Sequence, residues 1–194
     1  MLITNLKIEN FRNYNKLNLN LNNKINIFYG NNAQGKTNII ESIFLCSIGK
    51  SFRTSKDKEL AKFDKDFFRI EVQYKKSDRD GKIKIEYSDK KHIFINGIKV
   101  KKFSELLGKI NIVIFTPDDI NILKNGPKMR RRFLDIMISQ LRPNYIYCLN
   151  MYTKTLEQRN AYLKQIKLEH KSEDLLELWN QKLYEYGEKI YKYR

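Results

Sequence analysis

The sequence predicts an α/β protein in which a mixed sheet with an antiparallel meander precedes an α-helical arm. Three observations lead to this prediction: a glycine-rich loop between an apolar strand and an apolar-striped helix, a series of alternating strand patterns, and two later runs with helical spacing. We expect a first domain at residues 1–142 and the start of the arm at residues 143–194.

Strand patterns occupy the beginning of the chain. Apolar and polar residues alternate over 2–8 and 17–21, and an apolar run follows at 25–29. That run ends at Gly30, and residues 37–48 then carry apolar side chains at helical spacing. The order of strand, glycine loop and helix is the context in which phosphate-binding loops occur.

Residues 69–100 have the pattern of an antiparallel meander. The segments RIEVQYKK, KIKIEYS and HIFINGIKV are predicted strands, with Asp80-Gly81 in one connection and Asn96-Gly97 in the other. Asn-Gly readily supplies two positive φ angles and therefore favours a tight hairpin.

The last part of the chain predicts two amphipathic helices. The 3-4 spacing runs through Leu149, Tyr152, Leu156, Arg159, Leu163 and Ile166, and again through Leu176, Trp179, Leu183, Tyr186, Ile190 and Tyr193. We expect an antiparallel helical hairpin rather than one rod, with Ser172 as the N-cap of the second helix. Because the second run reaches residue 194 without a capping glycine or proline, the arm is expected to be truncated.

Composition limits the classes of function. The formal charge of +16 favours a polyanionic partner such as nucleic acid, although solvated lysines are the simpler alternative. Cys46 and Cys148 lie in apolar helical patterns without metal-ligand spacing, so buried thiols in a reducing cytoplasm are expected. No signal peptide pattern or apolar run of membrane-spanning length is present in the sequence.

The glycine loop has a specific chemistry. Glycines let the backbone approach phosphate oxygens, a lysine bridges the β- and γ-phosphates, and the following hydroxyl binds Mg²⁺. We therefore expect the nucleotide to be bound by Gly30, Asn31, Asn32, Ala33, Gln34, Gly35, Lys36 and Thr37, with Thr37 on the metal ion. The alternative is a glycine loop with an incidental lysine.

A hydrolysing protein of this kind also needs an apolar strand that ends in an acidic residue. A strand is expected at 110–115, but Thr116 and Pro117 separate it from Asp118 and Asp119. We predict that Asp118 begins a helix, whose first turn favours acidic residues, and that it does not hold the metal ion.

Several longer blocks carry a family resemblance. They are NFRNY at 10–14, GNNAQGKTNIIE at 30–41, GKSFRTSKDKEL at 49–60, ING at 95–97, FTPDDINILKNGPKMRRRFLD at 115–135 and QRNAYLKQ at 158–165. In order and spacing these blocks resemble the RecF family of bacterial recombination mediators from Met1 to residue 194. The family's second half, with its acidic strand, signature motif and switch loop, has no counterpart in the sequence.

The resemblance implies a fold and an activity. The RecF family is similar to the heads of Rad50 and SMC proteins, which implies a P-loop head of the ABC ATPase type that dimerises around ATP and Mg²⁺. It further implies an ATP-dependent protein of recombinational DNA repair, replication-fork restart and the SOS response, which binds single- and double-stranded DNA and works with RecO and RecR. Full-length members are expected to be slow ATPases, and this chain is expected not to be hydrolytically competent.

The resemblance also implies site residues outside the loop. Arg12 and Asn13 are expected beside the nucleotide, with a solvated turn as the alternative. Arg53 would reach phosphate or DNA, with a surface ion pair as the alternative. DNA contacts are further expected from Lys128, Arg131 and Arg132, and base stacking is open to Tyr184, Tyr186, Tyr191 and Tyr193, of which Tyr186 and Tyr193 have core spacing.

Two other functions stay open at this point. One is a small P-loop phosphotransferase with Asp118 or Asp119 as base, which the meander disfavours. The other is a DNA-binding or scaffolding fragment without nucleotide function.

Overall fold

The computed structural model describes residues 1–77, 79–120, 126–169 and 172–194. The chain forms two units, Met1–Ile114 and Phe115–Arg194. The boundary that we predict between head and arm, at 142/143, lies inside the second unit and stays a prediction.

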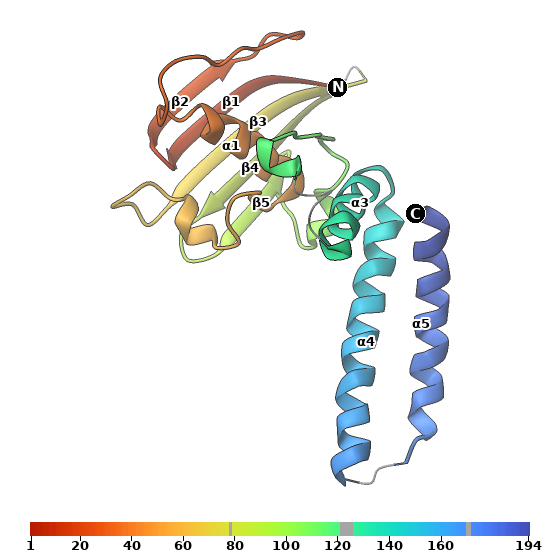
Figure 1. Ribbon diagram of the computed structural model, residues 1–194. Coiled ribbons are helices and arrows are strands. Elements are labelled where there is room, and N and C mark those ends of the chain that lie inside the picture. The colour runs from red at the N-terminus through yellow and green to blue at the C-terminus, as the bar shows by residue number, and fades with distance from the viewer. Residues whose placement is uncertain (78, 121–125, 170–171) are drawn as a thin grey trace. The chain divides into compact units, whose positions relative to one another are not determined.

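The first unit is built on a six-stranded sheet with the order β2-β1-β3-β4-β5-β6 (Figure 1). The strands are β1 (Leu2–Phe11), β2 (Tyr14–Asn20), β3 (Phe68–Lys76), β4 (Arg79–Tyr87), β5 (Lys91–Ile95) and β6 (Ile98–Lys99). All neighbouring strands pair in the antiparallel direction. The predicted meander is confirmed, and it continues the sheet that β1 and β2 begin.

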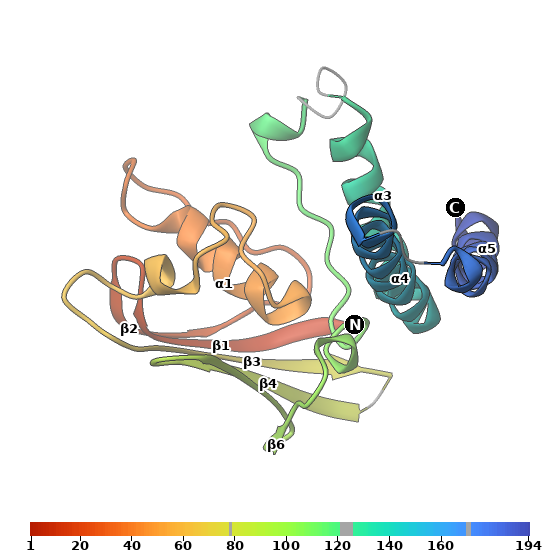
Figure 2. The same cartoon turned by 90° about the horizontal axis from the view of Figure 1, so that it is seen from below.

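Helix α1 (Lys36–Ile48) covers one face of this sheet (Figure 2). Alternation along the strands sends every second side chain toward the helix, and Leu6, Ile70 and Ile85 are fully buried there. The helix is apolar on most sides and buries nearly all of its residues after Ile39. The predicted helix at 37–48 is therefore confirmed, and its first residue is Lys36.

Two segments predicted as strands lie outside the sheet. Residues 25–29 and 110–115 have no partner strand among the described residues. A strand requires neighbours for its N–H and C=O groups, and the described strands pair with one another in an antiparallel order. Ile27 and Val113 are consequently 77% and 74% exposed, and the mixed sheet expected from the sequence is not found in the described part of the chain.

Of the two glycine-containing pairs that were predicted to connect the strands of the meander, only one forms a turn. Asp80-Gly81 lies inside β4, where Gly81 pairs with Tyr74, and a Cβ on Gly81 would come within 2.3 Å of the Tyr74 ring. This glycine therefore makes room for an aromatic side chain and does not form a turn. Asn96 and Gly97 do form a turn, between β5 and β6, with φ angles of 49° and 84°.

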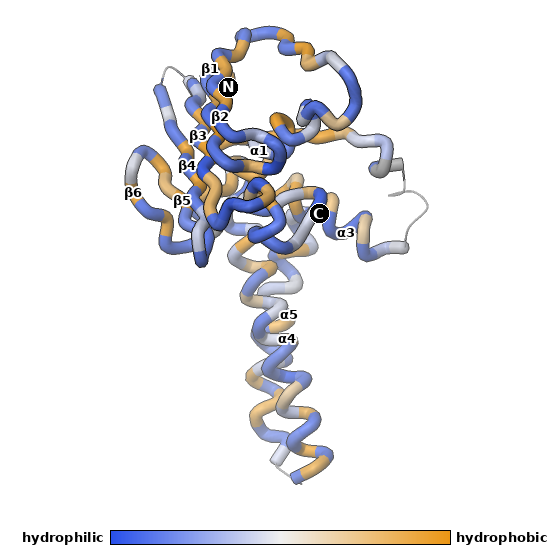
Figure 3. Tube along the Cα trace, turned by 90° about the vertical axis from the view of Figure 1, so that its left-hand side faces the viewer, coloured by the Kyte–Doolittle hydropathy of each residue, from blue (hydrophilic) through white to orange (hydrophobic). Residues whose placement is uncertain are grey.

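Among its described residues, the second unit contains the α-helices α3 (Pro127–Leu141), α4 (Pro143–Glu169) and α5 (Asp174–Tyr193). Helices α4 and α5 form the predicted antiparallel hairpin, and hydrophobic residues recur along both of them (Figures 1 and 3). The predicted seam residues are buried or half-buried except Tyr193, which is 37% exposed. Two helices can cover each other on one side only, so most of the seam stays half-exposed.

Two further predictions concern helix starts, at Ser172 and at Asp118. The prediction of Ser172 as the N-cap of α5 is wrong by one position, because Glu173 is the N-cap and makes no side-chain capping bond. Ser172 Oγ, one residue earlier, accepts a hydrogen bond from the Asp174 N–H at 3.2 Å and donates one to the Asp174 carboxylate at 2.6 Å. Asp118 lies in a short 3-10 helix, Pro117–Ile120, and α3 begins later, at Pro127. The predicted helix start near Asp118 is thus a single tight turn.

The junction of the three helices has a polar centre. Tyr145 is fully buried and donates a hydrogen bond to Asp135, and Arg194 contacts both residues, at 3.0 Å to Tyr145 and 2.7 Å to Asp135. Burial, followed by the bond to Asp135, raises the pKa of Tyr145 to about 12. The hydrogen bond that the phenol donates to the Asp135 carboxylate links α4 to α3.

Both cysteines are free and buried, as predicted. Burial raises the pKa of the Cys46 thiol well above its ordinary value, so this side chain behaves as a small apolar group. No helix among the described residues combines the length and apolar character needed to cross a membrane.

Trp179 provides a test of the hairpin. Its ring is half-buried and lies 4.8 Å from the Tyr162 ring, between centroids. Replacing Trp179 with alanine is expected to lower the free energy of unfolding by about 2 kcal/mol, less than for a fully buried ring. Chemical denaturation followed by circular dichroism measures this loss. Tyr184→Ala, at a 72% exposed position of the same helix, should cost under about 0.5 kcal/mol, and equal losses in the two variants would contradict the hairpin seam.

Candidate nucleotide site

The glycine loop leads directly into α1. Gly30, Ala33 and Gly35 have positive φ angles of 136°, 63° and 97°, so the backbone winds tightly before the helix begins at Lys36. The first turn of α1 contains no acidic residue. Its unpaired N–H groups and the positive end of the helix dipole therefore create an environment suited to an anion.

Gly35 is required by its neighbours as well as by its backbone angle. A Cβ at this position would lie 2.6 Å from Asn13 Oδ1 and 2.9 Å from Tyr14 Cε2. Both neighbours belong to the turn and strand that follow β1. The turn after β1 therefore packs directly on the loop, which places Asn13 beside the predicted nucleotide position.

Lys36 spans the loop. Its ammonium donates hydrogen bonds to the backbone carbonyls of Gly30 at 2.8 Å and Asn31 at 2.6 Å. Thr37 is exposed in the first turn of α1, and residues 31–34 are exposed as well. The exposed loop thus brings one ammonium and one hydroxyl together at the start of α1, and these are groups that bind a triphosphate with Mg²⁺.

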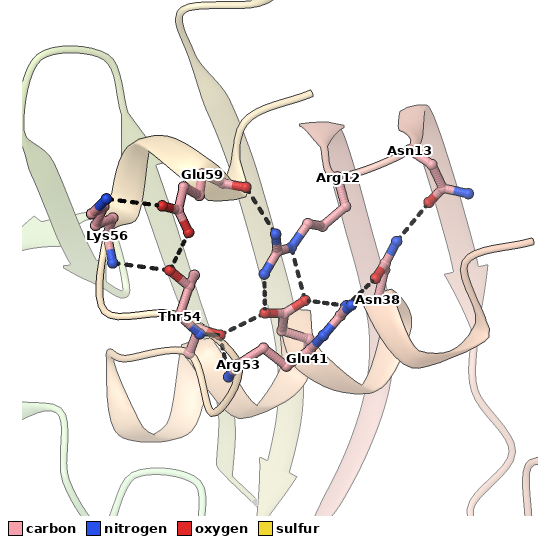
Figure 4. Close-up of polar contacts among 9 residues, drawn as sticks. Arg12, Asn13, Asn38, Glu41, Arg53, Thr54, Lys56 and Glu59 are labelled. Carbon is pink, nitrogen blue, oxygen red and sulfur yellow. Dashed lines mark hydrogen bonds and ion pairs between the residues drawn. The ribbon is translucent and has the colours of Figure 1, made fainter. Parts of the chain in front are cut away.

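A buried carboxylate on α1 is the centre of a network of polar contacts (Figure 4). Glu41, on α1, is fully buried and forms a bidentate pair with Arg12, at 2.7 Å from Nη2 and 3.0 Å from Nε. The third Arg12 nitrogen, Nη1, donates to the Glu59 carbonyl at 2.9 Å. Arg12 has a φ angle of 55°, so its backbone turns sharply just before Asn13.

The segment after α1 reaches the same carboxylate. Ser51 Oγ donates to Glu41 Oε1 at 2.5 Å, and Arg53 Nη1 lies 3.3 Å from Glu41 Oε2. Arg53 Nη1 also donates to Asn38 Oδ1 at 2.8 Å, and Asn38 donates to Asn13 Oδ1 at 2.9 Å. Arg53 is thus held in an ion pair, the alternative considered for it, and a role toward phosphate or DNA stays a prediction.

Thr54 and Glu59 extend this network. The Thr54 hydroxyl donates to the Glu59 carboxylate at 2.5 Å, and Lys56 lies 3.5 Å from the same carboxylate. The hydrogen bond from Thr54 is the main cause that lowers the pKa of Glu59. These contacts order the segment that carries Arg53.

Sequence reasoning missed Glu41, together with Asn38 and Ser51. A signal was present, because Glu41 is the one acidic residue in the apolar stretch TNIIESIFLCSI. A charge inside an apolar helix is costly unless it is paired, so it indicates a buried partner. The identity of that partner depends on residues far away in the chain, which the local pattern does not contain.

Asp119 has a local structural role. Its carboxylate accepts hydrogen bonds from the Thr116 N–H at 2.5 Å and the Thr116 hydroxyl at 2.8 Å. It therefore caps the turn at Pro117–Ile120. Among the described residues, no cluster of three or more His, Cys, Asp or Glu side chains is arranged to hold a metal ion.

The basic run on α3 forms a second candidate surface. Lys128, Arg131 and Arg132 are exposed in the first turns of α3, which has no acidic residue there. Arg130 is exposed as well and was not singled out by the sequence prediction, although it belongs to the same run. The four cations place a dense positive charge at the positive end of a helix dipole.

The tyrosines of α5 differ in how far their side chains are exposed. Tyr184 and Tyr191 are 72% and 83% exposed. Tyr186 packs edge-on against Tyr147, and Tyr193 packs edge-on against Tyr145. Core packing thus accounts for the half-buried Tyr186, whereas Tyr193 is 37% exposed and is not the core residue that its spacing predicted. Base stacking by the exposed tyrosines stays a prediction.

Comparisons with known proteins identify the family. The family model described as an AAA domain matches residues 5–193. The DNA replication and repair protein RecF of Clostridium acetobutylicum is 48% identical over 196 aligned positions, which cover 100% of this chain and 53% of that protein. RecF of Clostridioides difficile is 46% identical over 192 positions, covering 98% and 51%. The chain therefore spans about half the length of the curated relatives that it matches.

Solved structures agree with this result. A structure of the recombination mediator protein RecF-ATP in the RecFOR pathway has a TM-score of 0.92 and 45% identity, over 98% of this chain and 52% of that one. An SMC head domain from Pyrococcus furiosus, solved with the C-terminal domain of ScpA, has a TM-score of 0.50 and 20% identity, which shows likeness of fold alone. The chain belongs to the AAA domain family and is homologous to the amino-terminal portion of the DNA replication and repair protein RecF.

Proposed function

We propose that this chain is the nucleotide-binding part of a RecF-type DNA repair protein and that residues 30–37 bind Mg·ATP. The observation that carries the proposal is the position of Lys36, whose ammonium spans the loop at the start of α1. A homologue at 45% identity, described as RecF-ATP, supports it.

The proposed roles of the loop residues follow from their chemistry. The amides of residues 30–37 bind the phosphate oxygens, and Lys36 exchanges its two carbonyl partners for the β- and γ-phosphates. Thr37 holds Mg²⁺ through its hydroxyl. Arg12 and Asn13 border the nucleotide from the turn that packs on Gly35.

We extend the proposal to the activity of the longer family members. ATP acts there as a dimerisation switch, and the dimer binds single- and double-stranded DNA in the cytoplasm during recombinational repair with RecO and RecR. The exposed cations of α3 and Arg53 are the proposed DNA contacts of this chain. We also propose that the chain binds ATP without hydrolysing it, because Asp119 caps its own turn.

The experiment that tests the proposal is a calorimetric titration of the purified chain with ATP in the presence of Mg²⁺. Saturable binding of one nucleotide per chain is the expected result, with no phosphate release above background. A titration without heat, at protein concentrations where the chain is folded by circular dichroism, would reject the nucleotide function.

A further inference from the structure

We propose that Glu41 is a positioning residue of the nucleotide site, an inference that rests on the proposed nucleotide binding. Its carboxylate joins the turn after β1 and the segment after α1 to the helix that begins at the phosphate loop. The residue itself lies more than one helical turn beyond Lys36 and does not belong to the glycine loop.

The Glu41 carboxylate is saturated with hydrogen bonds. Glu41 is fully buried, and four hydrogen bonds converge on it, two from Arg12 and one each from Ser51 and Arg53. Each carboxylate oxygen accepts two of them. A buried ion pair adds little net stability compared with apolar packing, but removing one partner leaves the other charges buried and unpaired. This arrangement therefore fixes geometry more than it adds stability.

The donors to Glu41 come from separate parts of the chain. Arg12 comes from the turn that follows β1, whereas Ser51 and Arg53 come from the segment beyond the C-terminal end of α1. These parts of the chain are far apart in sequence and meet at this carboxylate (Figure 4). Backbone hydrogen bonds also join them, from the Arg12 N–H to the Leu60 carbonyl and from the Lys62 N–H to the Asn10 carbonyl, each at 2.8 Å. The Glu41 carboxylate thus links the side chains of the turn after β1 to those of the segment after α1.

A chain of hydrogen bonds leads from Glu41 to the loop backbone. Arg53 is bonded to Asn38, and Asn38 is bonded to Asn13. The Asn13 amide lies 2.6 Å from the position that a Cβ on Gly35 would take, so it is in close contact with Gly35. A movement of Asn13 toward the loop would therefore displace the loop backbone. A change at Glu41 therefore reaches Gly35 through contacts that are all present in the structure.

Replacing Glu41 with glutamine tests what the charge of this side chain contributes. Glutamine keeps the shape of the side chain, but it has one acceptor oxygen and its NH₂ group faces arginine donors. It cannot receive the bidentate pair from Arg12 together with the bonds from Ser51 and Arg53. We expect the side chains of the turn after β1 and of the segment after α1 to lose their fixed position, while α1 and the sheet remain folded.

The experiment compares ATP binding by Glu41→Gln and by a matched core variant. At a temperature well below unfolding, Glu41→Gln is expected to bind Mg·ATP about tenfold more weakly than the wild type, the scale on which outer hydrogen-bond partners act on a bound group. Glu41→Asp, which keeps the charge, should recover part of the affinity. Val72→Ala removes a fully buried side chain from β3, so it should lower the melting temperature and leave the dissociation constant unchanged.

Each outcome decides the inference. If Glu41→Gln binds ATP as tightly as the wild type, the positioning role of Glu41 is overturned and the proposed nucleotide function stands. The same holds if Val72→Ala loses as much ATP affinity as Glu41→Gln. Absence of ATP binding by the wild type would overturn the proposed function and the inference with it. If Glu41→Gln does not fold, Arg12→Lys takes its place, because lysine keeps the charge without the bidentate geometry, and unchanged affinity in that variant would overturn the inference.

Discussion

Replacing Lys36 with alanine is expected to abolish measurable Mg·ATP binding. The Lys36 ammonium is already positioned across the loop by the carbonyls of Gly30 and Asn31. It can therefore turn to two phosphate groups without a large rearrangement of the backbone. Hydrogen bonds to charged groups contribute about 1.5–3 kcal/mol each, and about 1.4 kcal/mol is a factor of ten in affinity. Loss of two such bonds predicts weakening by at least about 100-fold.

The control for this variant lies at the other end of the same helix. Lys50 is exposed just beyond the end of α1, so Lys50→Ala removes the same charge without touching the loop. Calorimetric titration should give wild-type affinity for Lys50→Ala and no binding for Lys36→Ala. Thermal unfolding of the nucleotide-free proteins checks that both variants are folded. Equal binding by the two variants would show that the glycine loop is not the site.

Hydrolysis separates the proposed function from the phosphotransferase alternative. We expect phosphate release at background level for the wild type and for Lys36→Ala alike. Steady turnover that disappears on changing Lys36 or Asp118 would show that the TPDD segment takes part in catalysis. That result would favour a phosphotransferase or a self-sufficient ATPase.

The elements that the sequence predicted correctly are those defined by consecutive residues. The loop and α1 follow from glycine spacing and one apolar helix, and the hairpin of α4 and α5 follows from two periodic runs. The segment at 25–29 has an equally clear apolar pattern but is not a strand, because a ladder depends on a distant partner. Gly81 has the composition of a turn, and it lies inside β4 because the Tyr74 ring passes over it.

The candidate site likewise contains residues that the sequence predicted and residues that it did not. The loop residues were predicted because their function requires them to be adjacent in sequence. Glu41 was not, because its partners Arg12 and Arg53 come from both sides of α1 and meet only in the folded chain. Burial and pairing of a charge are tertiary properties, and they decide which polar residues position a site.

Changing Arg131 and Arg132 to alanine is expected to weaken DNA binding strongly and to reduce its salt dependence. Each lost phosphate contact lowers the slope of log affinity against log salt by about 0.9, so the double variant should differ by about 1.8. Two lines that differ by this slope and meet at about 1 M salt are separated by about 60-fold in affinity at about 0.1 M. Fluorescence anisotropy of a labelled duplex at several salt concentrations measures both quantities.

The matched variant removes two charges elsewhere in the same unit. Lys154 and Lys164 are exposed on α4, so their replacement by alanine lowers the net charge equally without touching α3. If the start of α3 is a DNA contact, the α4 variant keeps the wild-type slope and the α3 variant does not. The distinction is physical, because counterions are released only where a cation lies against a phosphate, whereas a distant charge acts through a field that salt screens within about 10 Å at 0.1 M. Equal slopes in the two variants would place the contacts outside α3, and sequence preference should be slight in every case because phosphate contacts do not read bases.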